Sequence, residues 1–141
     1  MNGLIVYVDH PVDPADIDAI IGGHEGDVGF VAGSGGDRAS WAVESMDDMR
    51  AKTSANAWRQ IADAFEPVSA ISIRYSHPDV ARPLVRALAD RWRVVIDDDC
   101  GRLWSGAAWA RRMATEPAWN WLEDERDEDP DRQGYELHLE P

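Results

Sequence analysis

Residues 3–9 (GLIVYVD) constrain the fold more than any other segment, because they are almost continuously apolar and rich in β-branched side chains. The side chains of a strand alternate between the two faces of its sheet, so an unbroken apolar run must be covered on both faces. We therefore expect this segment to be the innermost strand of a sheet.

Periodicity and helix caps predict the remaining elements. Further strands are expected at residues 27–32, 38–45, 69–75, 93–97 and 134–141. Helices are expected to begin at Asp13, at Ser54, near Asp79 and at Ser105. The order is βαββαβαβα with a final strand, and its first half matches the split βαβ, or ferredoxin-like, pattern. We predict an α+β fold whose mixed or antiparallel sheet carries its helices mainly on one face.

The domain boundaries follow from composition. Residues 1–122 are expected to form a single α+β domain. Residues 123–132 hold seven carboxylates and no large apolar side chain, so we read 123–133 as an acidic linker or loop. Residues 134–141 alternate apolar and polar side chains, which favours a C-terminal edge strand of the same domain.

The net charge of the chain indicates which classes of partner it can bind. The chain holds 27 Asp and Glu against 14 Lys and Arg, a net charge of −13. A surface that binds nucleic acid must neutralise phosphates with cations, so the excess of acidic residues disfavours nucleic acid as a partner. A field of this sign attracts cations, and a basic protein partner is therefore expected.

A cytoplasmic location is expected from the cysteine count and the N-terminus. The single cysteine, Cys100, cannot form a disulfide within the chain. No run of about 18 apolar residues is present, and the first residues lack the basic and apolar regions of a signal peptide. We therefore expect neither membrane insertion nor classical secretion.

No motif identifies a catalytic residue or a cofactor. The cluster at residues 33–36 (GSGG) lacks the Lys-Ser/Thr ending of a phosphate loop and is read as a hairpin loop. Neighbouring carboxylates raise the pKa of a thiol, which disfavours Cys100 as a nucleophile. We expect no catalytic residue and no cofactor.

A group of tryptophans next to the acidic segment offers a candidate partner-binding surface. An aromatic patch bordered by carboxylates can bind a cationic protein through cation–π contacts with its Lys or Arg side chains. The alternative is that these indoles close one end of the core. The candidate residues are Trp104, Trp109, Trp119, Trp121, Glu123, Asp124, Glu125, Asp127, Glu128 and Asp129.

Acidic and imidazole groups also follow the ends of three predicted strands. These groups are Asp9, His10, His77, Asp97 and Asp99. If the strand ends share one rim of the sheet, the groups could hold a divalent metal and support a small metal-dependent hydrolase. The competing interpretation is turn and capping chemistry, which uses the same residue types.

One segment is similar to part of a known class of bacterial proteins. Residues 94–99 (VVIDDD), followed by Gly101, by Leu103-Trp104-Ser105 and by a helix, resemble a segment of small acidic bacterial proteins of the immunity type. The resemblance covers about residues 75–113. It implies a cytoplasmic inhibitor that binds a toxin enzyme and blocks its active site, and no site residue is carried over from it.

The expected function is therefore a non-enzymatic acidic binding protein, plausibly an immunity protein that blocks a basic toxin enzyme. The metal-dependent hydrolase described above is one alternative. The other is a structural or homodimeric protein that associates through its C-terminal edge strand.

Overall fold

The computed structural model describes residues 2–22, 24–25, 28–123 and 136–139. Within them one mixed sheet has the strand order β2-β3-β4-β5-β1-β6-β7-β8. Its strands are β1 (Asn2–Val8), β2 (His24–Glu25), β3 (Val28–Ala32), β4 (Arg38–Glu44), β5 (Ser69–Tyr75), β6 (Val94–Asp97), β7 (Arg102–Ser105) and β8 (Glu136–His138). Neighbouring strands are antiparallel except β7 and β8, which are parallel. The predicted α+β fold with a mixed sheet is confirmed.

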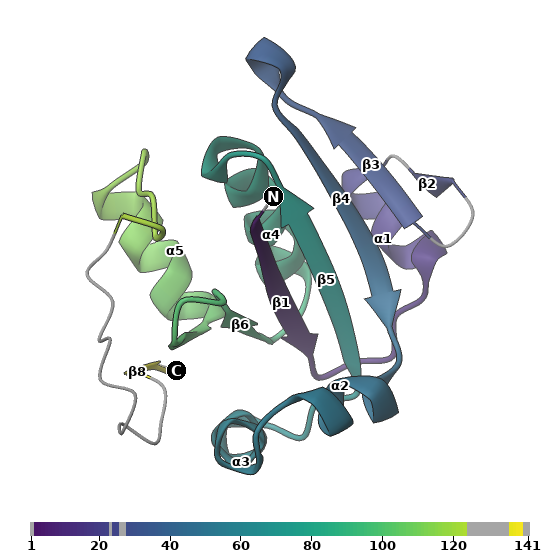
Figure 1. The fold of residues 1–141 in the computed structure, drawn as a ribbon, viewed down its shortest axis with the longest axis vertical. Helices are drawn as coiled ribbons and strands as arrows, with labels where there is room; N and C mark the ends of the chain where they lie inside the picture. Colours follow the sequence, from purple (N-terminus) through teal and green to yellow (C-terminus); the bar gives the residue numbers. More distant parts are fainter. Residues whose placement is uncertain (1, 23, 26–27, 124–135, 140–141) are drawn as a thin grey trace.

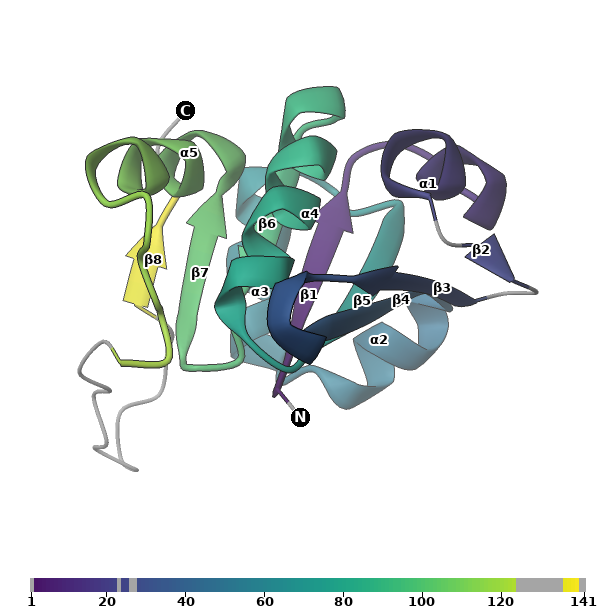
Figure 2. The same cartoon turned by 90° about the horizontal axis from the view of Figure 1, so that it is seen from above.

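Helices lie on both faces of the sheet. They are α1 (Pro14–Ile21), α2 (Met46–Lys52), α3 (Ala55–Ala64), α4 (Pro78–Arg91) and α5 (Gly106–Thr115). Figure 2 shows α1, α4 and α5 on one face, here called the first face, and α2 and α3 on the second face. No helix in the described part of the chain is both long and apolar enough to cross a membrane.

The predicted innermost strand is confirmed as β1, which lies between β5 and β6. Leu4, Val6 and Val8 point to the first face and pack under α1 and α4. Tyr7 points to the second face, where it packs with Met49 of α2 and Ile61 of α3. Burial on both faces explains why residues 4–8 of this strand carry no charged side chain.

The strand order differs from the ferredoxin-like expectation. That pattern would place β4 next to β1, but β5 lies between them. The reason is the connection between β4 and β5, which contains α2 and α3. This connection starts and finishes at the same end of the sheet, the end where β4 stops and β5 begins. Strand β5 therefore pairs antiparallel to β4, with Glu44 opposite Ala70, instead of crossing to the far side of β1.

Helices α2 and α3 cover only part of the second face. In Figure 1 they lie at the lower end of the sheet, and the upper parts of β1, β5 and β4 have no helix in front of them. The first face is covered by three helices. Among the described residues, no helix thus lies over the second face at the upper parts of β1, β5 and β4, and we call this part of the sheet the open face.

Candidate functional site

The four candidate tryptophans lie in the core. Trp104, Trp109, Trp119 and Trp121 are all buried and belong to the core of the first face. The ring centroids of Trp104 and Trp119 are 4.8 Å apart, and those of Trp109 and Trp121 are 4.9 Å apart. The core interpretation of these indoles is therefore confirmed, and in this arrangement they present no surface to a partner.

The acidic candidates beside the tryptophans are mostly outside the described residues. Glu123 is described and exposed. Asp124, Glu125, Asp127, Glu128 and Asp129 lie outside the described residues, as does the rest of the predicted linker. Strand β8, which follows that linker, lies at the edge of the sheet beside β7.

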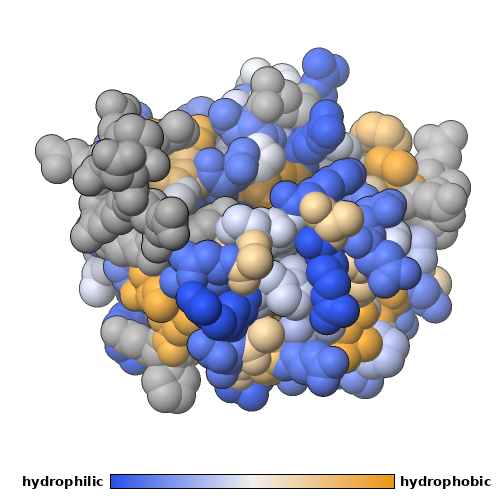
Figure 3. Space-filling view, turned by 60° about the horizontal axis from the view of Figure 1, so that its bottom comes forward, coloured by the Kyte–Doolittle hydropathy of each residue, from blue (hydrophilic) through white to orange (hydrophobic). Residues whose placement is uncertain are grey.

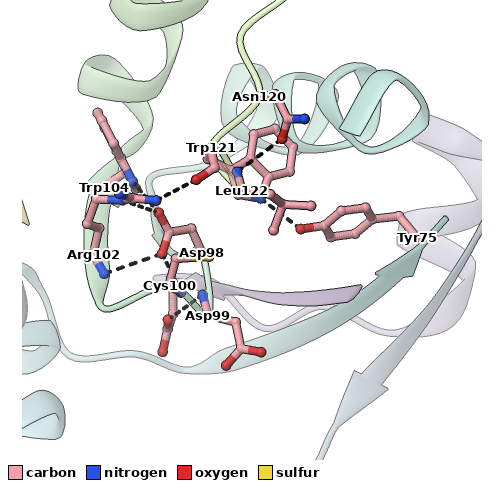
Figure 4. Close-up of polar contacts among 10 residues, drawn as sticks. Tyr75, Asp98, Asp99, Cys100, Arg102, Trp104, Asn120, Trp121 and Leu122 are labelled. Atoms are coloured by element: carbon pink, nitrogen blue, oxygen red, sulfur yellow. Dashed lines mark hydrogen bonds and ion pairs between the residues drawn. The ribbon is translucent and has the colours of Figure 1, made fainter. Parts of the chain in front are cut away.

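A buried charge network holds the tryptophan segment in place (Figure 4). The fully buried carboxylate of Asp98 accepts hydrogen bonds from Arg102 Nε at 2.8 Å and from Trp104 Nε1 at 3.1 Å. Arg102 Nη2 donates to the carbonyl of Trp121 at 2.6 Å, and Trp121 Nε1 donates to the Tyr75 hydroxyl at 2.7 Å. This network joins the β6–β7 turn to residues far along the chain, which is a structural role.

Sequence reasoning missed Asp98, although it singled out both of its neighbours. Asp97, Asp98 and Asp99 are chemically identical in the sequence, and the turn decides which of them is buried. Asp98 also accepts a hydrogen bond from Cys100 N at 2.8 Å, the contact of an Asx turn. A cation four residues later, Arg102, was the available signal.

The proposed metal ligands do not share a rim of the sheet. Asp9 and His10 follow Val8, whose partners are Ser69 and Val94. His77 follows Tyr75, which pairs with Asn2 at the other end of β1, about 20 Å away along the strand. Because β5 and β6 both run antiparallel to β1, His77 and the turn after β6 lie at the end opposite to Asp9.

The prediction of a metal site is therefore wrong for this set of residues. Within the described ranges no group of three or more His, Cys, Asp or Glu side chains could hold a metal ion. Individual members have local roles instead: His77 caps α4 by accepting a hydrogen bond from Asp79 N at 3.1 Å, and the His10 ring stacks on Trp92. The turn and capping interpretation explains these positions.

Asp97 differs from the other predicted ligands because it lies in a row across the open face. The strand register places its side chain between Ile5 of β1 and Leu103 of β7. The same row continues through Ser72 and Ala42 on one side and ends at Leu137 on the other. The half-buried carboxyl group of Asp97 thus lies between the partly buried Ile5 and the fully buried Leu103.

The environment of Asp97 favours its neutral form. Burial, with smaller contributions from the negative charges of Asp98 and Asp99, raises the pKa of this carboxyl group from 3.8 to about 6 against the lowering effect of a backbone hydrogen bond. That bond comes from Asp99 N at 2.9 Å. Within the described residues, no cation lies at ion-pair distance from Asp97.

The open face also carries exposed apolar side chains at its two ends. Phe30 of β3 is 61% exposed and lies opposite Ser40, on the same side of the sheet as Asp97. Leu137 of β8 is 48% exposed. Between these ends, Ser72 Oγ donates to Glu44 Oε1 at 2.7 Å, and the register also places the exposed Arg38 and Arg74 on this face.

A separate groove of about 390 Å³ lies between α3, α4, β6 and α5. Its apolar walls include Phe65, Trp92, Val95 and Leu139. Two of its polar groups are engaged internally: Arg93 donates to the carbonyl of Ala64 at 2.9 Å, and Ser105 Oγ caps α5. Asp63 adds a carboxylate to the lining, which is otherwise mainly apolar.

Comparison with known proteins gives no assignment for these surfaces. No protein-family model matches the chain, and neither the curated proteins nor the solved structures give a significant match. The functional argument consequently depends on the residues and geometry described above.

Proposed function

We propose that this protein is a non-enzymatic acidic binding protein whose partner is a basic protein. The observation that carries the proposal is the distribution of charge. Residues 1–37 contain seven Asp and Glu and no Lys or Arg, whereas residues 38–122 contain eleven acids and twelve Lys and Arg. The excess of acid therefore lies in residues 1–37 and in residues 123–141, which contain nine Asp and Glu and two Arg.

The cations of the middle of the chain are used internally. Arg82 contacts Asp79 and donates to the carbonyl of Trp119, while Arg102 pairs with the buried Asp98. On and beside α1, the exposed Asp9, Asp13 and Asp16 have no ion pair with a described residue. A long-range negative field of this kind accelerates association with a cationic partner by about 10- to 1000-fold.

The surface favours an interface with polar and electrostatic character. In Figure 3, where the end with α2 and α3 comes forward, hydrophobic residues form several separate patches between hydrophilic ones. An obligate interface is more apolar than this, whereas partners that also exist alone bind through mixed surfaces. The proposed partner is accordingly a protein that is stable without this chain.

The finer form of the proposal is an immunity protein that blocks a basic toxin enzyme. Two features support it: the resemblance of residues 75–113 to immunity-type proteins, and the acidic charge, which can imitate nucleic acid toward an enzyme that cleaves it. No catalytic chemistry is required of this chain in such a role.

The test is direct binding to the purified products of neighbouring genes, especially basic ones. We expect one of them to bind, and its association rate to fall steeply between about 50 mM and about 300 mM salt because the attraction is screened. Coexpression should also protect cells from that product. If no neighbouring basic protein binds at the lower salt concentration, the proposed function is wrong.

Self-association through the sheet edge is a second candidate. Strand β8 forms that edge with Leu137 exposed, and edge strands pair readily with a second chain. A dimer mass in solution that persists at low protein concentration would favour this candidate, and a monomer mass would exclude it.

A further inference from the structure

We infer that the groove between α3, α4, β6 and α5 binds a free α-amino acid with a large apolar side chain. Asp63 receives the ammonium group of this ligand, Arg93 receives its carboxylate, and the apolar walls receive its side chain. This inference goes beyond the proposed function and does not depend on it, because no partner protein enters the argument.

The groove has the size and the composition of a small-molecule site. Its volume is about 390 Å³, and sites for small ligands measure about 300–1,000 Å³. Apolar side chains form most of its lining and a few polar groups accompany them, which is the usual composition of such sites. The groove therefore has space for an apolar ligand beside groups that can fix the orientation of that ligand.

Two opposite charges line the groove without pairing with each other. Within the described residues, the carboxylate of Asp63 makes no ion pair or hydrogen bond, and Arg93 makes no ion pair. Arg93 donates from Nη2 to the carbonyl of Ala64 at 2.9 Å. Because a guanidinium group has five N–H donors, further donors of Arg93 are left for a ligand.

Both charged groups lie at the same end of the groove. Ala64, which accepts the hydrogen bond from Arg93, directly follows Asp63 at the end of α3. The guanidinium group of Arg93 also lies over the ring of Phe65, 5.4 Å from the ring centroid, and this contact holds it beside α3. The groove thus has a polar end with one negative and one positive group.

The rest of the lining is apolar. Val94 and Val95 of β6 are 2% and 1% exposed and form the buried part of the lining. Gly106 lets the start of α5 approach them closely, since a Cβ at this position would lie 3.2 Å from Val94 Cγ2. Trp92 and Leu139 add large apolar side chains. A ligand held at the polar end can therefore place an apolar side chain against these residues.

A zwitterion matches the charges better than other ligands do. The ammonium and carboxylate groups of an α-amino acid are attached to one carbon atom, so they can contact Asp63 and Arg93 at the same time. A cationic ligand would lie beside the like charge of Arg93, and an anionic ligand beside that of Asp63. An uncharged ligand would remove water from both groups without replacing the lost hydrogen bonds.

The experiment titrates the full chain with L-phenylalanine at about pH 7 and follows the backbone amide shifts by NMR. A ligand of about a dozen non-hydrogen atoms should bind with a Kd on the order of 0.1–1 mM. N-acetyl-L-phenylalanine lacks the ammonium charge and L-phenylalaninamide lacks the carboxylate, so each should bind about fivefold more weakly. Glycine, which has no side chain, should cause no shift.

Variants assign each charge to its group. Asp63→Asn should weaken L-phenylalanine and the amide about fivefold without weakening the N-acetyl compound, and Arg93→Met should weaken L-phenylalanine and the N-acetyl compound without weakening the amide. Ala107→Leu extends an exposed side chain of the lining into the groove and should weaken all three ligands. The control Glu66→Gln removes an exposed carboxylate outside the lining and should change Kd by less than about twofold.

The outcomes separate this inference from the proposed function. The amino-acid site is wrong if about 20 mM L-phenylalanine shifts no amide of the groove lining, because the Kd then lies far above the expected range. Equal binding of the three ligands to the wild type, or an equal loss of all three in Asp63→Asn, contradicts the assignment of the charges. None of these results bears on the binding of a basic protein, which tests the proposed function.

Discussion

Replacement of Asp97 by Asn should stabilise the folded protein at neutral pH. Burial and like charges raise the pKa of Asp97 from 3.8 to about 6, so the folded state holds its proton more tightly than the unfolded chain does. At about pH 7 both states have lost that proton, and the shift of roughly two units costs the native protein about 3 kcal/mol. An asparagine has the same shape, keeps an acceptor for Asp99 N, and removes this cost.

The pH dependence identifies the cause. Below about pH 4 the wild-type carboxyl is protonated in both states, so the wild type and Asp97→Asn should have similar free energies of unfolding. As the pH rises through about 6, the wild type loses stability relative to the variant, and the difference reaches about 3 kcal/mol, or about 10 °C in Tm.

Urea unfolding of both proteins between about pH 4 and pH 7, followed by far-ultraviolet circular dichroism, measures this difference. Glu66→Gln, which alters an exposed carboxylate, serves as the control and should show a small, nearly constant difference from the wild type. A difference for Asp97→Asn that does not change with pH, or that makes the variant less stable at neutral pH, would refute the reasoning.

Two further substitutions test the packing. Arg102→Met leaves the buried carboxylate of Asp98 without its cation and should cost about 3–5 kcal/mol in urea unfolding, whereas a variant that also carries Asp98→Leu should recover part of that loss. Gly29→Ala should cost about 1–3 kcal/mol or prevent folding, because the new Cβ would lie 1.9 Å from Trp41 Cε2; thermal unfolding measures this, and an unchanged Tm would show that the indole moves freely.

Local signals predicted much of the fold. Asp13, Ser54 and Ser105 are the N-caps of α1, α3 and α5, as their sequence context indicates. Each cap depends on a hydrogen bond to a residue three positions later, which a sequence displays directly. The innermost strand at residues 3–9 was equally predictable, because burial on both faces of a sheet requires a continuous run of apolar side chains.

Helix α2 was missed despite having the same kind of signal. Ser45 caps it, and Asp47 and Asp48 lie in its first turn. The segment is only seven residues long and follows a strand directly, and the predicted strand 38–45 includes its N-cap, Ser45. Short helices depend on packing, here of Met49 against the second face, and packing partners are not local in sequence.

The candidate site was the least predictable part. Grouping Asp97 with Asp9 required the direction of three strands, which long-range pairing decides. The separation of Asp97 from Asp98 depended on a single turn, in which Asp99 adopts a positive φ of 61°. Sequence reasoning singled out Asp97 for a metal role that the topology does not support.

The tryptophan cluster makes one end of the molecule optically distinct. The rings of Trp109 and Trp119 lie 4.8 Å apart and tilted at 61°, close enough for their electronic transitions to couple. The near-ultraviolet circular dichroism should therefore report mainly on packing under α5. Loosening of the Asp98–Arg102 pair, which holds the Trp121 segment, would erase that signal.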